Sequence, residues 1–91
     1  MLRFECKRGA RMNKDIEIRI GKNIKQARES IKMTQEVLAA KLQLRGCDIT
    51  RSAVAKIEVG QRHLYPDEII LIKEILNTEF DTIFYGEEEK I

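Results

Sequence analysis

Residues 33–60 read MTQEVLAAKLQLRGCDITRSAVAKIEVG, and this stretch decides the fold. Thr34 and Thr50 each precede a segment with periodic apolar residues, and threonine is a favoured helix N-cap because its side-chain oxygen accepts a backbone N–H. Gly46 and Gly60 follow the two segments, and glycine readily takes the positive φ that ends a helix. The stretch therefore predicts two short helices joined by a connection around Gly46.

Apolar residues recur three or four positions apart in both segments, as they do on the buried face of an amphipathic helix. After Thr34 they are Val37, Leu38, Ala39 and Leu42. After Thr50, in a helix predicted over residues 51–58, they are Val54 and Ile57. The second short helix is left with a polar, partly basic outer face.

Three further helices are predicted on either side of this stretch. Before it, a helix from about Ile16 carries a stripe of Ile20, Ile24, Ala27, Arg28 and Ile31. After it, Pro66 opens a helix whose acidic first turn suits the positive helix terminus. The apolar stripe of that helix is Ile69, Ile70, Ile72, Ile75 and Leu76. With a last helix from Asp81 to about Tyr85, the sequence predicts an all-α fold, a compact bundle of five helices.

The formal net charge of +2 hides a gradient along the chain. Lys and Arg outnumber Asp and Glu by ten to four in residues 1–32 and by five to three in residues 33–64. In residues 65–91 they are outnumbered by eight to two, so the three segments carry +6, +2 and −6. A basic first third favours a surface for phosphates or anionic lipid, and the acidic end is expected to face elsewhere. An uneven solvated surface is the alternative.

Several classes of protein are disfavoured by size and composition. A chain of 91 residues makes one small domain with little room for a deep substrate cavity. Cys6, Cys47 and His63 cannot supply the four ligands of a structural zinc site, and no apolar run approaches the roughly 18 residues of a membrane span. No motif places a nucleophile, acid and base together. We therefore expect no enzymatic activity, no cofactor and no metal, and a cytoplasmic location because no signal peptide is present.

The two ends of the chain are expected to lie outside the folded domain. Residues 1–15 are predicted to be a flexible segment, within which Met12 is an alternative start. Residues 16–86 form the predicted domain, and residues 87–91 an acidic tail. The competing interpretation of the first segment is a basic arm along nucleic acid. Its cationic side chains would be Arg3, Lys7, Arg8 and Arg11.

Three motifs follow one another in the sequence at separate places. They are Ile20-Gly21-Lys22-Asn23-Ile24 continuing to Arg28, MTQEVLA over residues 33–39, and VAKIEVG over residues 54–60. Together they resemble the Cro and phage-repressor type (XRE family) of helix-turn-helix transcriptional regulator, over roughly residues 16–86. The resemblance implies a lambda-repressor-like DNA-binding fold. The chain departs from the family pattern by five extra residues, Gln43 to Cys47, which must lengthen the first helix of the motif or enlarge its turn.

The resemblance implies a role for each matching position. Arg28 and Glu58 match a mostly buried ion pair that ties the first helix to the end of the third. Gln35 matches a residue whose side chain and backbone N–H meet a DNA phosphate. The remaining backbone candidates are Thr50, Arg45 in the enlarged turn, and Gln61, Arg62 and His63 in the following loop.

The base-facing positions of the family match Arg51, Ser52 and Lys56. Arg51 and Lys56 can each donate to O6 and N7 of guanine, so G·C pairs at two major-groove positions are expected. The alternative is two solvated charges on an exposed helix face. Ala53 and Ala55 either contact a thymine methyl or pack inward, and packing is favoured for Ala53.

Two functions from different classes follow from these observations. The first is a sequence-specific, double-stranded-DNA-binding transcriptional regulator of repressor type, acting as a homodimer on a pseudo-palindromic operator. Its dimer surface is predicted in the acidic C-terminal third, with closure of the bundle as the alternative use of the same residues. They are Phe80, Ile83, Phe84, Tyr85 and Ile91. The second function is an antitoxin-like or adaptor protein whose main role is to bind a protein partner through the C-terminal helices.

Overall fold

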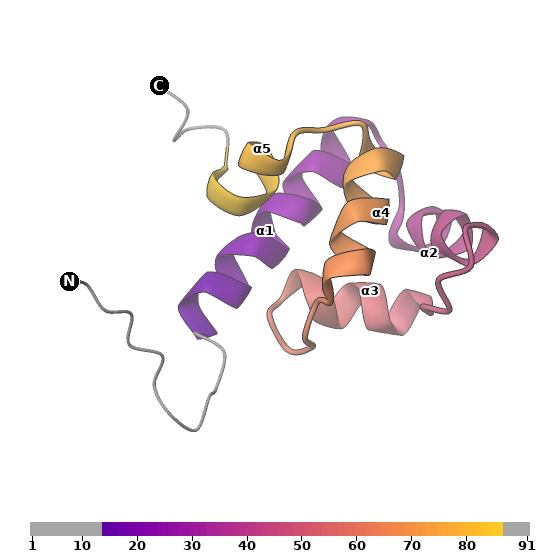
Figure 1. The fold of residues 1–91 in the computed structure, drawn as a ribbon, viewed down its shortest axis with the longest axis horizontal. Helices are drawn as coiled ribbons and strands as arrows, with labels where there is room; N and C mark the ends of the chain where they lie inside the picture. Colours follow the sequence, from indigo (N-terminus) through magenta and orange to yellow (C-terminus); the bar gives the residue numbers. More distant parts are fainter. Residues whose placement is uncertain (1–13, 87–91) are drawn as a thin grey trace.

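Five α-helices follow one another through residues 14–86, which are the residues that the computed structural model describes (Figure 1). They are α1 (Lys14–Ser30), α2 (Gln35–Leu44), α3 (Arg51–Glu58), α4 (Pro66–Leu76) and α5 (Phe80–Tyr85). The predicted all-α class and the five helices are confirmed in this part of the chain. The start at Met12, the basic arm and the acidic tail lie outside the described residues.

The helix boundaries follow from local sequence. α1 begins at Lys14, two residues before the expected start of the domain, with Asp15 and Glu17 in its first turn. α4 begins at Pro66, where a missing N–H is tolerated, and ends at Leu76, followed by Asn77 in the left-handed conformation. Ile16 and Ile18 both lie within α1, in agreement with the helix predicted from about Ile16.

One buried core joins all five helices. Each contributes at least one fully enclosed aliphatic side chain, and the residue between α2 and α3, Ile49, adds another. The largest enclosed side chains are Ile24, Leu38, Leu42, Ile49, Val54, Ile72 and Ile83. α5 packs along α1, α2 packs on α3 and on α4, and α1 crosses α3 (Figure 1). This arrangement leaves one side of α3 free of the rest of the fold.

Gly21 marks the place where α1 and α3 come closest. A Cβ built on Gly21 would lie 2.2 Å from the backbone oxygen of Ile57 and 2.9 Å from that of Glu58. Any side chain at this position would therefore push the end of α3 away from α1. Gly21 lies in the first motif of the sequence, and its lack of a side chain allows the close approach of α3 to α1.

Four apolar side chains differ in exposure from what the predicted buried stripes and the predicted dimer surface require. Ile31 is exposed because α1 ends at Ser30, one residue earlier. Val37 and Ile70 are exposed because the neighbouring side chains of α2 and α4 already fill the core. Ile83, predicted at a dimer surface, is 0% exposed and belongs to the core. The part of that prediction that rests on Ile83 is wrong, because α5 packs along α1 and encloses this side chain in the core.

Candidate nucleic-acid interface

The two threonines at the centre of the sequence cap α2 and α3. The Thr34 hydroxyl oxygen accepts a hydrogen bond from the Val37 N–H at 3.1 Å, and the Thr50 hydroxyl accepts one from the Ala53 N–H at 3.1 Å. Each bond satisfies a backbone donor that the helix itself leaves free. The start of α3 is thus fixed by its own sequence.

α3 has one buried face and one exposed face. Val54, Ile57 and Glu58 are turned into the core, whereas Arg51, Ser52 and Lys56 are exposed. Among the described residues, no carboxylate pairs with Arg51 or Lys56. Both cations therefore stand at the surface of a short, well-anchored helix, free to bind an anion or a hydrogen-bond acceptor.

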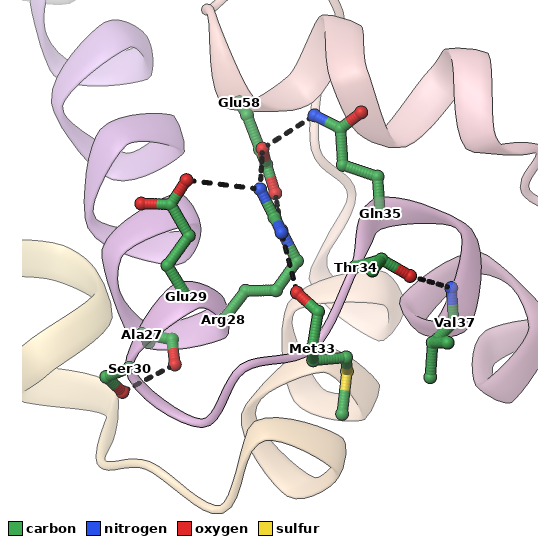
Figure 2. Close-up of polar contacts among 9 residues, drawn as sticks. All are labelled: Ala27, Arg28, Glu29, Ser30, Met33, Thr34, Gln35, Val37 and Glu58. Carbon is green, nitrogen blue, oxygen red and sulfur yellow. Dashed lines mark hydrogen bonds and ion pairs between the residues drawn. The ribbon is translucent and has the colours of Figure 1, made fainter.

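Arg28 and Glu58 lock α3 to α1 (Figure 2). Arg28 Nε donates to Glu58 Oε2 at 2.7 Å and Arg28 Nη2 donates to Glu58 Oε1 at 2.9 Å, so the pair is bidentate. Arg28 Nη1 donates to the Met33 carbonyl oxygen at 2.7 Å, which adds the α1–α2 turn. The hydrogen bonds from Arg28 to Glu58 raise the pKa of Arg28, against the effect of burial. The structure thus brings together the two residues that the resemblance paired.

The Gln35 side chain lies in the same network. Its Nε2 donates to Glu58 Oε1 at 2.9 Å, as Figure 2 shows, and the residue is half-buried. The side-chain amide expected on a phosphate is therefore used inside the protein, and the exposed contact left to this position is the backbone at the start of α2. Beside it is an open depression of mixed charge, whose lining includes Lys32, Gln35, Arg51 and the carboxylates of Glu29 and Glu36.

The extra residues between α2 and α3 both lengthen α2 and enlarge the turn. α2 continues to Leu44, and residues 45–50 connect it to α3. Gln43 Nε2 donates to the Ile49 carbonyl oxygen at 2.7 Å, which holds the connection against the last turn of α2. The Arg45 guanidinium pairs with the Glu74 carboxylate of α4. Arg45, expected at the DNA backbone, is thus tied to another helix.

The loop after α3 holds a second bidentate pair. Arg62 Nη1 and Nη2 donate to the two Glu68 carboxylate oxygens at 3.0 and 3.2 Å, and the Tyr65 N–H donates to Glu68 Oε1 at 3.0 Å. Burial opposes ionisation of Glu68, but these hydrogen bonds outweigh it and its pKa is lowered. His63 Nδ1 lies 2.9 Å from Glu17 Oε2. Gln61 is exposed next to the end of α3.

The acidic partners of these arginines are the site residues that sequence reasoning missed. Glu68 belongs to the acidic first turn predicted for the fourth helix and Glu74 was given no role, and nothing local in the sequence links them to Arg62 or Arg45. A faint signal exists for Glu68, which lies three residues after the N-cap of α4, where a glutamate commonly accepts the N-cap backbone N–H.

Other kinds of site find little support in residues 14–86. They contain no group of three or more His, Cys, Asp or Glu placed to hold a metal ion. No helix among them is long and apolar enough to cross a membrane. The chemistry that the described surface offers is hydrogen bonding and charge at α3 and around its two ends.

Comparison with known proteins places this arrangement in a family. The helix-turn-helix family model matches residues 24–83. The DNA-binding domain of BldD superposes with a TM-score of 0.68 at 14% identity, covering 80% of this chain and 99% of that domain. The restriction-modification controller protein C.AhdI from Aeromonas hydrophila superposes with a TM-score of 0.63 at 28% identity, covering 74% of this chain and 94% of that protein. Comparison with curated proteins gave no match.

The chain belongs to the helix-turn-helix family and is a DNA-binding transcriptional regulator of the Cro and phage-repressor (XRE) type. The match covers α2, the enlarged turn and α3, so the insertion is accommodated within the motif. The similarity to BldD bears on the fold alone.

Proposed function

We propose that α3 lies in the major groove of double-stranded DNA and recognises the bases of a pseudo-palindromic operator, with two copies of the chain on one site. The observation that carries this proposal is the pair of exposed cations Arg51 and Lys56, without a carboxylate partner in residues 14–86, on a helix whose opposite face is buried in the core. An exposed helix face with free donors matches the acceptor pattern of guanine, whose O6 and N7 both face the major groove. Each half-site then contains G·C pairs at two positions.

Phosphate contacts in this proposal come from groups that surround α3. The Thr50 hydroxyl accepts the Ala53 N–H and keeps its own hydrogen to donate. The N-terminus of α2, with Lys32 beside it, suits an anion, and Glu29 and Glu36 nearby weaken the attraction. Gln61 lies at the other end of α3. Arg45 and Arg62 contribute less, because a phosphate has to compete with Glu74 and Glu68 for them.

The proposed dimer forms through α5. Phe80 and Tyr85 are exposed, and the Phe80 ring stacks on the half-buried Phe84 ring with centroids 6.2 Å apart. Arg19 of α1 extends this surface, since its guanidinium lies 5.7 Å from the centre of the Tyr85 ring. A single small domain covers about half an operator, and two copies about one helical turn apart supply the affinity of a specific site.

The dimer proposal is tested at Tyr85, because this side chain is 52% exposed and its loss leaves the core intact. Tyr85→Asp is expected to give a folded monomer with weaker operator binding, measured by sedimentation and by gel shift. Tyr65→Asp is the matched control, since Tyr65 is 53% exposed but is the N-cap of α4 and does not belong to α5. A Tyr85→Asp protein that sediments as a dimer would overturn this choice of surface.

Selection of bound sites from random double-stranded DNA tests the whole proposal. The selected sequences are expected to contain two related half-sites with guanines at fixed positions and a spacing near one helical turn. A selection that enriches no sequence rejects the proposal.

A second candidate function uses the same aromatic surface. The exposed rings of Phe80 and Tyr85 also suit a protein partner, as in an antitoxin-like or adaptor protein for which DNA binding is secondary. Copurification separates the two functions. A stoichiometric protein partner, released by Tyr85→Asp, together with DNA binding that shows no sequence preference favours the second.

A further inference from the structure

Val59 lies on the same face of α3 as the exposed polar residues. In a helix, positions seven and three residues apart face the same direction, which aligns Val59 with Ser52 and with Lys56. Val59 is the C-cap of α3 and is 54% exposed, although its side chain is entirely apolar. Ala53 and Ala55, the apolar candidates from the sequence, are half-buried. The large apolar group that α3 offers outward is therefore Val59.

The end of α3 holds Val59 in this orientation. The Gly60 N–H donates to the Ile57 oxygen at 3.1 Å and the Gln61 N–H donates to the Lys56 oxygen at 2.8 Å, the two bonds of a Schellman motif. Gly60 has φ +79° and is buried, and a Cβ on it would lie 2.5 Å from Ile18 Cγ1. Because the backbone on both sides of Val59 is anchored, the valine side chain cannot turn toward the core.

Val59 lies one turn after Lys56 on the same face of α3, so a helix that brings Lys56 to a base edge brings Val59 close to the neighbouring base pair. The apolar group that base pairs present in the major groove is the C5-methyl of thymine. We propose that Val59 contacts a thymine methyl in each half-site, next to the bases that Arg51 and Lys56 contact, an inference that rests on the proposed function.

The experiment compares thymine with deoxyuridine, which lacks only that methyl group. Each thymine of the selected operator is replaced in turn, and binding is measured by competition. The wild-type protein is expected to prefer thymine by about fourfold at one position of each half-site, the equivalent of one methyl-sized group removed from water. Val59→Ala is expected to bring this ratio close to one at the same position. Val37→Ala is the matched control, because Val37 is similarly exposed but lies on α2.

The outcomes separate this inference from the function beneath it. If Val59→Ala keeps the wild-type ratio at every thymine while Arg51→Ala loses a guanine preference, Val59 has no methyl contact and the inference is overturned. If the wild-type protein binds all sequences equally, the proposed function itself is wrong, and the inference about Val59 is rejected with it. Thermal unfolding followed by circular dichroism checks that both valine variants remain folded.

Discussion

Two groups of basic residues around α3 look alike in the sequence but differ in the structure. Three arginines are bound to glutamates of other elements, in the pairs Arg28–Glu58, Arg45–Glu74 and Arg62–Glu68. Two cations on α3, Arg51 and Lys56, have no carboxylate partner within the described residues. The paired arginines connect elements of the fold, whereas the proposed function assigns the exposed cations of α3 to the DNA.

The three pairs also differ among themselves in exposure. The side chains of Arg28 and Glu58 are 7% and 1% exposed, those of Arg62 and Glu68 are 29% and 9%, and those of Arg45 and Glu74 are 44% and 47%. Water screens an exposed pair and leaves a buried charge costly to uncover. Stability effects should therefore fall in this order.

The largest effect is expected from Arg28→Ala. It leaves the Glu58 carboxylate buried with only the Gln35 amide as a side-chain partner, so the free energy of unfolding should drop by about 3–5 kcal/mol in urea denaturation. Arg51→Ala serves as the control and should stay within about 0.5 kcal/mol of wild type. A drop below about 1 kcal/mol for Arg28→Ala would place this pair with the exposed ones.

Glu68→Gln should change how stability depends on pH. The pKa of Glu68 is lower in the folded chain than in the unfolded chain, so its ionised form stabilises the fold. This contribution, about 1.5–3 kcal/mol from charged hydrogen bonds, is present at pH 7. It fades as pH falls below the unfolded value of about 4.3 and through the lower folded pKa. Denaturation of both proteins from pH 7 to pH 3 should show curves that converge; a constant separation would contradict the assignment.

Arg51→Ala should affect DNA rather than the fold. If Arg51 donates to a guanine, its loss costs about 1–3 kcal/mol on the cognate operator and relaxes preference at that position. Titrations on cognate and random duplexes measure both. Equal losses on the two duplexes would move Arg51 from the bases to the backbone.

Arg45→Ala should have the smallest effect on the fold, because its ion pair is exposed on both sides. We expect a loss of about 0.2–1 kcal/mol in the free energy of unfolding. Any loss of DNA affinity should be the same on cognate and random duplexes, with a salt dependence weaker by about one unit of slope. A loss confined to the cognate duplex would give Arg45 a role in sequence recognition.

Much of the fold follows from local sequence. Thr34, Thr50 and Pro66 mark helix starts because capping and the fixed φ of proline act within a few residues, and the apolar spacing of each segment gives its buried face. Ile70 and Ile83 show what apolar spacing cannot predict. Ile70 was predicted in a buried stripe and is exposed, whereas Ile83 was predicted at a surface and is buried. The backbone contact at Gly21 depends on how two helices cross.

The candidate site divides in the same way. The resemblance named Arg28 and Glu58, thirty positions apart, and the structure joins them. It could not find Glu74 for Arg45, because the enlarged turn has no counterpart in the family pattern. For Gln35 the resemblance supplied a position at the start of α2 but not the hydrogen bond to Glu58. In the structure the Gln35 side-chain amide donates to Glu58 Oε1, in addition to the bonds from Arg28. Exposed cations on α3 are visible in the sequence, but their lack of partners is a tertiary property.

Parallel selections from random DNA with the wild-type protein, Arg51→Ala and Arg45→Ala test most directly whether the unpaired cations recognise bases and the paired ones do not. We expect the wild type and Arg45→Ala to select the same pair of half-sites, and Arg51→Ala to select half-sites that have lost one guanine each. Identical half-sites from wild type and Arg51→Ala would contradict the distinction on which this account of the protein depends.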